Sequence, residues 1–357
     1  MMKNLFFMKR MFSLSLLAAG MATASMAQVT LNIDAGERGA LIGDRHYGIF
    51  FEEINHAGDG GLYAELIHNR SFEDNASNPD KWWPVGGARM SLDTEGLLNE
   101  AQGHALRMEM RAAGDGVRNE GFWGINVVQG RTYKLSLWLK GAPSYDGTLT
   151  ATLQSEDGTA LGQSEIPVKA DGTWRKLEAE ITATGDDPRG WLALTGSAPG
   201  TVVVDVVSLF PPTYKDRPNG CRPDLAEMLE AMKPRFVRFP GGCYVEGVWA
   251  NNSTNRFEWK NTIGPIEERP GHMNQNWGYR VSDGMGFHEM LQLTEDLGAE
   301  PLFVVNMGMG HGWAENYRDI DEYIQEAHWS TATATRKPPN GERSAPRTDT
   351  RNRSTCG

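Results

Sequence analysis

Apolar and polar residues alternate with a period of two along the middle of the chain, from about residue 73 to residue 211. Leu106, Met108 and Met110 alternate with charged neighbours, and the same pattern recurs over 133–139 and 177–181. Asp-Gly pairs at 115–116, 146–147, 157–158 and 171–172 separate the runs and favour tight turns. Many short strands at this spacing predict an all-β sandwich over 73–211, closed by a strand at 201–210.

Helical spacing marks the segments on both sides of this region. Before it, residues 46–54 predict a buried strand that ends at the acidic pair Glu52-Glu53. A helix is then expected from the spacing of four apolar residues, Leu62, Tyr63, Leu66 and Ile67. After the sandwich, Pro223 opens a predicted helix. Its expected apolar face consists of Leu225, Met228, Leu229 and Met232.

Strands and helices then alternate. Residues 236–239 predict a strand, and a helix is expected from near Asp283 to Gly298. The apolar run 302–305 predicts a strand covered on both faces, and Ile320 opens another helix. Alternation of this kind predicts an α/β domain with a parallel sheet, which the sandwich interrupts.

Composition narrows the class of protein. With 357 residues, 39% of them hydrophobic, the chain has enough apolar material for sizeable cores, which excludes disorder throughout. Its net charge of −11 argues against a nucleic-acid partner. Three cysteines are too few for a disulfide scaffold, and no segment after the N-terminal run is apolar enough to span a membrane.

The two ends of the chain differ from the rest. Lys3, Lys9 and Arg10 precede an apolar run and small residues at 25–27. We therefore expect residues 1–27 to be a signal peptide and the protein to be exported, to the periplasm or outside the cell. Residues 328–357 contain no Val, Ile, Leu, Met or Phe, and six basic residues face two acidic ones. A solvated tail is one interpretation of that composition.

Four residues end apolar strands or lie in the turns beyond them, where parallel α/β folds place their sites. They are Glu52, Arg238, Cys243 and Asn306. Each type also has a structural interpretation, because the acid could be solvated, the arginine an ion-pair partner and the cysteine a small buried residue. Indoles in the sandwich region could likewise be core residues or could stack on sugar rings. These are Trp82, Trp83, Trp123 and Trp191.

Other chemistries lack their motifs. The glycine-rich loop 308–312 has Trp313 where a dinucleotide-binding loop needs a third glycine. His311 has no second His or Cys at ligand spacing, so we expect neither a metal site nor a cofactor. The chain contains no Gly-x-Ser-x-Gly elbow for a serine nucleophile.

Three long motifs carry a family resemblance. They are YGIFFEEI at 47–54 with its continuation over 60–73, RFPGGCYVEG at 238–247, and WKNTIGP at 259–265. Over about residues 29–327 the chain resembles the α-L-arabinofuranosidases of glycoside hydrolase family 51, with a middle part similar to a carbohydrate-binding module. The resemblance implies a truncated (β/α)₈ TIM barrel at 28–72 and 212–327, interrupted at 73–211 by a jelly-roll sandwich.

The family releases terminal α-L-arabinofuranosyl units from arabinan and arabinoxylan with retention, which requires two carboxylates about 5–5.5 Å apart. By resemblance Glu52 matches its sugar-binding glutamate and Arg238 an arginine that orients carboxylates. Cys243 matches a position that holds asparagine or cysteine. The acid/base and nucleophilic glutamates match no residue here, so the resemblance implies a truncated, inactive arabinofuranosidase. The alternative is a non-catalytic carbohydrate-binding protein.

The resemblance also suggests partners and an origin for the tail. We expect an arabinose-containing plant cell-wall polysaccharide as the partner, and a homo-oligomer is possible at the level of the family. Codons allowed for residues 339–357 encode, one frame over, a string similar to the family's next segment. We therefore interpret residues 328–357 as the product of a frameshift between Glu326 and His328.

Overall fold

The computed structural model describes residues 30–34, 36, 39–250, 253–311 and 320–335. The chain divides into two compact units, Met1–Gly43 and Asp44–Gly357, and the elements below belong to the second. The predicted signal peptide and residues 336–357 of the predicted frameshifted tail lie outside the described residues.

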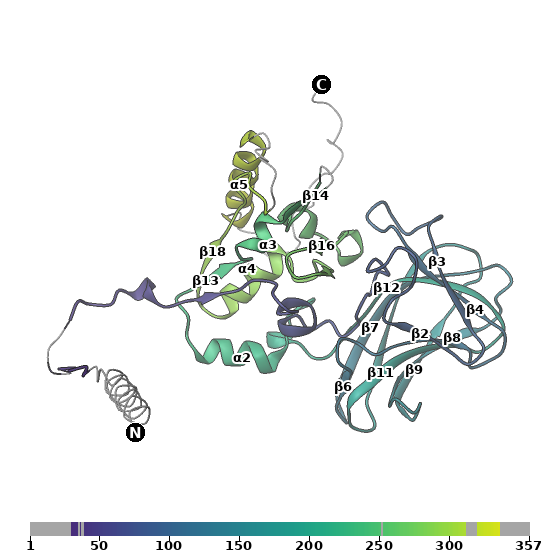
Figure 1. The fold of residues 1–357 in the computed structure, drawn as a ribbon. Helices are drawn as coiled ribbons and strands as arrows, with labels where there is room; N and C mark the ends of the chain where they lie inside the picture. The colour runs from purple at the N-terminus through teal and green to yellow at the C-terminus, as the bar shows by residue number, and fades with distance from the viewer. Residues whose placement is uncertain (1–29, 35, 37–38, 251–252, 312–319, 336–357) are drawn as a thin grey trace, which may run out of the picture. The chain divides into compact units, whose positions relative to one another are not determined.

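Eleven strands between residues 82 and 210 form two antiparallel sheets (Figure 1). They are β2 (Trp82–Val85), β3 (Arg89–Asp93), β4 (Ala105–Met110), β5 (Gly116–Asn119), β6 (Ile125–Val127), β7 (Thr132–Gly141), β8 (Thr148–Gln154), β9 (Ala160–Pro167), β10 (Arg175–Thr182), β11 (Asp187–Gly196) and β12 (Gly200–Phe210). One sheet has the order β10-β7-β12-β4-β3, and the other has the order β2-β5-β11-β8-β9 with β6 beside β11.

The two sheets share one apolar core. Alternate residues of β4, among them Leu106 and Met108, are fully buried together with Leu135 and Leu137 of β7 and Leu192 of β11. Successive side chains of a strand point to opposite faces, so a period of two places every second residue in this core. The predicted run of strands, including the closing strand, is confirmed.

A second, parallel sheet consists of β1 (Ile49–Phe50), β13 (Phe236–Phe239) and β18 (Glu300–Phe303), in that order. Ile49 pairs with Val237, and Phe236 pairs with Glu300. The eleven strands of the sandwich thus lie, in sequence, between two neighbouring strands of this sheet, as the pattern predicted. Strand β13 has the predicted bounds, whereas β1 is much shorter than the run 46–54.

Helices and short elements make up the rest of the second unit, as far as the structure describes it. The helices are α2 (Pro223–Ala231), α3 (Cys243–Glu246), α4 (Phe287–Asp296) and α5 (Ile320–Thr335). Two hairpins pair β14 (Val248–Ala250) with β15 (Ser253–Asn255), and β16 (His272–Asn274) with β17 (Tyr279–Val281). Short helical turns are η1 (Asp44–His46), η2 (Gly58–Leu62), η3 (Tyr214–Asp216), η4 (Trp259–Thr262) and η5 (Ile266–Glu268). Among the described residues, no helix combines the length and apolar character needed to cross a membrane.

Helix α2 begins at Pro223 as predicted, but only Leu225 and Leu229 of its predicted apolar face pack against the core. Met228 and Met232 are 67% and 47% exposed, whereas Ala226 is fully buried. The small alanine faces the core cluster beside the parallel sheet, with Leu225 and Leu229 packed at its edge. Hydrophobic spacing located the helix but did not identify which side contacts the sheet.

The predicted helix over residues 62–67 is also wrong. After the single turn η2 the chain is extended, and Tyr63 forms an isolated antiparallel bridge with Cys221. The backbone N–H groups of Ala64 and Leu66 donate to the carbonyls of Gly220 and Leu209 at 3.1 and 3.0 Å. Because these donors bond to a returning segment, they are not available to a helix, and Leu62, Tyr63 and Ile67 are all buried.

Helix α4 and strand β18 depart from prediction in smaller ways. The helix ends before Gly298, whose φ is +66°, as predicted, but it begins at Phe287 instead of near Asp283. Asp283 instead accepts from Tyr244 Oη at 3.3 Å and contacts the His272 ring at 3.0 Å. Leu302 is 49% exposed, so β18 is not covered on both faces.

Candidate functional site

Glu52 lies just beyond β1, at the carboxyl end of the parallel sheet. It is 8% exposed, and its Oε1 accepts a 2.8 Å hydrogen bond from the backbone N–H of Tyr244. Gly241 passes so close that a Cβ there would overlap the Glu52 side chain, and its φ of +135° is one that favours glycine. The turn after β13 therefore fixes the Glu52 carboxylate against the start of α3.

Cys243 begins α3 next to Glu52. Burial raises the pKa of its thiol, and the nearby carboxylates of Glu52 and Glu246 raise it further. Its carbonyl accepts a 2.7 Å hydrogen bond from Asn276 Nδ2. The structure thus brings two of the four predicted site residues together.

Arg238 occupies the middle of β13, between Phe50 and Leu302 on the neighbouring strands. Its guanidinium carbon lies 4.7 Å from the centroid of the Phe50 ring, a cation–π contact. Phe50 is 51% exposed, so this face of the sheet is open in the described part of the chain. Arg238 is therefore held beside an aromatic ring.

Asn306 supports the loop that follows β18. Its Nδ2 donates to the carbonyls of Val245 and Met309, both at 2.9 Å. Its Oδ1 accepts from the backbone N–H groups of Gly308 and Met309 at 2.6 and 3.0 Å. These bonds use the two donors and two acceptor positions of the amide. Asn306 thus fastens the loop to the end of α3, and this geometry leaves the amide little capacity for a sugar hydroxyl.

Glu53 is a second buried carboxylate that the sequence motif placed beside Glu52 but gave no role. Its Oε2 accepts from the N–H of Gly58 at 2.6 Å, and its Oε1 accepts from Tyr279 Oη at 2.8 Å. Burial raises its pKa to about 8, and the nearby Asp59 carboxylate adds to this effect. Only the three-dimensional placement of Tyr279 and Asp59 reveals this environment.

Replacing Glu53 with glutamine should make the stability of the fold less dependent on pH. The folded protein keeps a proton that the unfolded chain, with a pKa of 4.5, has already lost. Wild-type stability therefore falls as pH rises through the folded pKa, by on the order of 2–3 kcal/mol between about pH 5.5 and 8.5. Asp59, whose pKa burial also raises, contributes in the same direction. Urea denaturation of both proteins at the two pH values measures this, and an equal fall in both would contradict it.

One group of side chains could hold a metal ion. Ligand atoms of Cys243, Glu246 and His311 all lie within 4.8 Å of one another. The contact between His311 Nε2 and Glu246 Oε2 is 2.6 Å. Cys243 and Glu246 are one helical turn apart on α3, whereas His311 comes from the loop after β18. Ligand spacing along the sequence missed this group because its third member is 65 residues away from Glu246.

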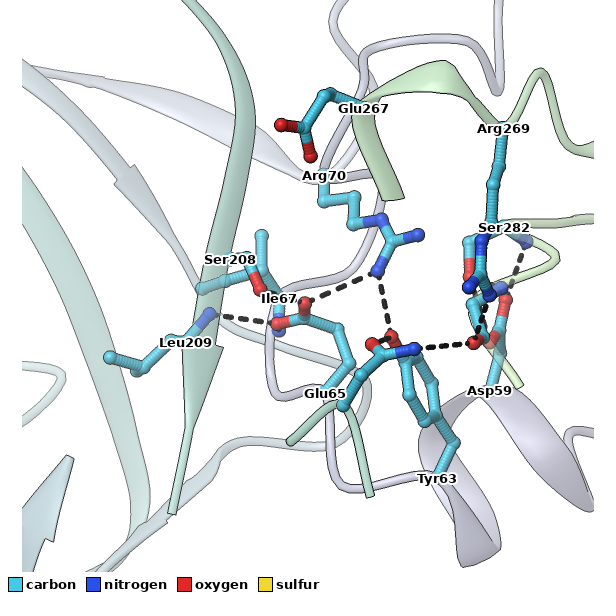
Figure 2. A network of polar contacts seen from close by, with 12 residues as sticks. Asp59, Tyr63, Glu65, Ile67, Arg70, Ser208, Leu209, Glu267, Arg269 and Ser282 are labelled. Atoms are coloured by element: carbon cyan, nitrogen blue, oxygen red, sulfur yellow. Dashed lines mark hydrogen bonds and ion pairs between the residues drawn. The ribbon is translucent and has the colours of Figure 1, made fainter. Parts of the chain in front are cut away.

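A buried polar network lies where the chain leads into the sandwich (Figure 2). Arg70 donates to Tyr63 Oη at 2.9 Å and pairs with Glu65 at 3.5 Å. Glu65 also accepts from the backbone N–H groups of Ile67 and Leu209 at 3.0 and 2.8 Å. The Glu65–Arg70 pair therefore ties the segment before the sandwich to the end of β12.

The four tryptophans expected in the sandwich region have different environments. Trp82 is buried, whereas Trp123 is 65% exposed. The rings of Trp83 and Trp191 meet edge to face, with centroids 5.2 Å apart. The Trp123 and His56 ring centroids are 5.6 Å apart, and His56 belongs to the loop that follows the acidic pair Glu52-Glu53. One of the four indoles is thus clearly available to a ligand.

Comparisons with known proteins agree with the motifs. The profile described as "Alpha-L-arabinofuranosidase 1 domain" matches residues 228–338, and one described as "Carbohydrate binding domain" matches residues 64–200. "Alpha-L-arabinofuranosidase 1" of Arabidopsis thaliana is 39% identical over 315 residues, which are 84% of this chain and 46% of the relative. The "Extracellular exo-alpha-L-arabinofuranosidase" of Streptomyces chartreusis is 41% identical over 334 residues, 88% of this chain and 39% of that protein.

A solved structure gives the same result. The arabinose-bound MgGH51 α-L-arabinofuranosidase superposes with a TM-score of 0.74 at 36% identity, covering 79% of this chain and 47% of that one. The chain spans less than half the length of these relatives. Over the matched length the chain therefore corresponds to the N-terminal portion of the α-L-arabinofuranosidases of glycoside hydrolase family 51, including a carbohydrate-binding domain.

Proposed function

We propose that this chain forms the sugar-holding part of a retaining α-L-arabinofuranosidase that releases terminal arabinofuranose from arabinan or arabinoxylan. The observation that carries the proposal is the buried Glu52 carboxylate, fixed beside Cys243 at the carboxyl end of the parallel sheet. A fixed carboxylate accepts hydrogen bonds from sugar hydroxyls without first being ordered. We assign Glu52 and Cys243 to direct contact with the furanose, Arg238 to orienting carboxylates, and Asn306 to shaping the adjoining loop.

The open face of the parallel sheet supports a barrel. Phe50, Arg238 and Leu302 are register partners in one row, and both Phe50 and Leu302 are about half exposed. In a (β/α)₈ barrel such a row faces the interior, and the catalytic groups gather at its carboxyl end. We propose that residues 28–72 and 212–327 are parts of this barrel and that 73–211 form a jelly-roll module within it.

We also propose a polysaccharide partner and export for this chain. The carbohydrate-binding domain and the exposed Trp123 favour an arabinose-containing plant cell-wall polysaccharide as the partner. The N-terminal sequence pattern and the extracellular Streptomyces relative support export.

We expect this 357-residue polypeptide to bind arabinoxylan fragments without hydrolysing them. Retaining hydrolysis needs two carboxylates about 5–5.5 Å apart, one as nucleophile and one as acid/base. Glu52 and Glu53 do not provide this pair, because Glu52 accepts from the backbone of Tyr244 whereas Glu53 is turned towards Gly58 and Tyr279. Isothermal titration with arabinoxylo-oligosaccharides, beside a nitrophenyl-arabinofuranoside assay, measures both properties.

Two variants locate the binding. Glu52→Gln should weaken binding by about 10- to 100-fold, because a charged acceptor contributes on the order of 1.5–3 kcal/mol to a hydrogen bond. Trp123→Ala tests the sandwich, with Trp174→Ala as the matched control, since the Trp174 indole already donates to the Gly96 carbonyl at 3.0 Å. Binding that survives Glu52→Gln and is lost in Trp123→Ala would favour the alternative, a non-catalytic carbohydrate-binding protein. Measurable turnover by the purified chain would refute the expectation of inactivity.

A further inference from the structure

We propose that Cys243, Glu246 and His311 form a binding site for a zinc-class divalent cation, next to Glu52. Neither the family profiles nor the names of the relatives refer to a metal, and the inference stands whether or not the chain binds arabinose. Three features of the molecule support this site: the types of the three side chains, the hydrogen bonds that hold their backbone, and the charge around them.

The three side chains are the ligand types that zinc prefers. A thiolate, an imidazole and a carboxylate bind Zn²⁺ at about 2.3, 2.0–2.1 and 2.0–2.2 Å. In a tetrahedral site such ligand atoms lie roughly 3.3–3.7 Å apart, as those bond lengths require. The three ligand atoms lie within 4.8 Å of one another and the His311–Glu246 pair is at 2.6 Å, so side-chain rotations can bring the atoms to this spacing. Glu246 and His311, at 43% and 46% side-chain exposure, have room for this movement.

The backbone that carries the ligands is fixed by hydrogen bonds. The N–H of His311 donates to the Gly247 carbonyl at 2.8 Å, and His311 forms a parallel bridge with Val248. The N–H of Gly247 donates to the Cys243 carbonyl at 2.8 Å, which closes the turn of α3. Asn306 holds the same loop through its own hydrogen bonds. The backbone bonds of His311 and the side-chain bonds of Asn306 therefore both keep the imidazole beside α3. Little backbone ordering is therefore left for an ion to impose.

The local charge favours a cation. The Glu246 carboxylate lies within 4.8 Å of the Cys243 sulfur, and the Glu52 carboxylate is close enough to repel a thiolate there. A divalent ion would offset this repulsion, because it replaces the thiol proton: the S–H bond breaks, a metal–sulfur bond forms, and one proton passes to solvent. Thiolate, carboxylate and neutral imidazole then balance the two charges of the ion. Three protein ligands leave the fourth tetrahedral position to water or to a sugar hydroxyl.

An ordinary ion pair between His311 and Glu246 is the competing explanation, and cobalt distinguishes the two. Co²⁺ replaces Zn²⁺ in tetrahedral sites, and thiolate ligation produces a charge-transfer band in the near ultraviolet. We expect the full chain, titrated with CoCl₂ under reducing conditions, to develop this band and to lose it on addition of ZnCl₂. Cys243→Ser should abolish the band, and His311→Ala should weaken Co²⁺ binding by at least about tenfold, the scale seen for partners of metal ligands.

The other two cysteines provide matched controls. Cys221 is buried, and burial raises the pKa of its thiol to about 12, so Cys221→Ser should leave the band unchanged. Cys356→Ser removes the remaining thiol, which lies outside the described residues. Absence of the band in the wild type, or a band that persists in Cys243→Ser, would overturn the proposal. Circular dichroism of each variant establishes that a lost band reflects a lost ligand and not a lost fold.

Discussion

Replacing Arg70 with alanine should lower the free energy of unfolding by about 3–5 kcal/mol, because it leaves the buried Glu65 carboxylate without its cationic partner. Both side chains are only 3% exposed. The substitution also removes the 2.9 Å hydrogen bond that Arg70 donates to Tyr63 Oη (Figure 2). Chemical denaturation of the two proteins, fitted with a common m-value, measures the difference.

Arg107→Ala is the matched control. Arg107 forms a bidentate pair with Asp93, with both hydrogen bonds at 2.7 Å, but its side chain is 37% exposed. Solvent screens such a pair, so we expect a loss of less than about 1 kcal/mol. Glu65→Gln combined with Arg70→Ala should recover part of the loss, because it removes the uncompensated charge. Equal effects of Arg70→Ala and Arg107→Ala would contradict the role given to the buried pair.

Replacing Gly241 with alanine should abolish measurable sugar binding and cost about 1–3 kcal/mol of stability. The added Cβ would overlap the Glu52 side chain, and the φ of +135° is strained for any residue with a Cβ. Glu52 would have to leave the position in which it accepts from Tyr244. Titration with an arabinoxylo-oligosaccharide and thermal unfolding report the two effects separately.

Gly298→Ala separates backbone strain from the clash. Gly298 follows α4 with a φ of +66°, and an added Cβ there meets nothing within 4 Å. This variant should lose about 1 kcal/mol of stability, as alanine does in a left-handed position, and keep its sugar affinity. If Gly241→Ala behaved in the same way, Glu52 would not be part of the sugar site.

The sequence pattern correctly predicted those elements whose packing is regular or whose ends are marked by residues nearby in the sequence. The alternation through Leu106 and Met108 located β4, because both sheets of the sandwich bury every second residue. Strand β13 was predicted to the residue, since Pro234 and Pro240 bound it on both sides. Glu52 and Cys243 were placed in one region because strand ends of a parallel sheet meet at one edge.

The predictions that failed depended on contacts distant in sequence. Residues 62–67 have helical spacing but bond to the segment that returns from the sandwich, a partner that periodicity does not encode. Met228 has the spacing of a core residue, yet it is 67% exposed, whereas Ala226 is fully buried. His311 showed no ligand spacing because its neighbours on α3 precede it by a whole strand–helix unit.

The chain leaves for the sandwich and returns from it along paired paths. Three backbone hydrogen bonds join the two paths. The N–H groups of Arg222, Leu66 and Val207 donate to the carbonyls of Leu62, Leu209 and Arg70 at 2.8, 3.0 and 2.9 Å, respectively. Two ends held this close can be joined by a short turn as readily as by a whole domain, because closing a longer loop costs little additional entropy. Such a junction allows evolution to gain or lose the sandwich as a whole domain while β1 stays paired with β13.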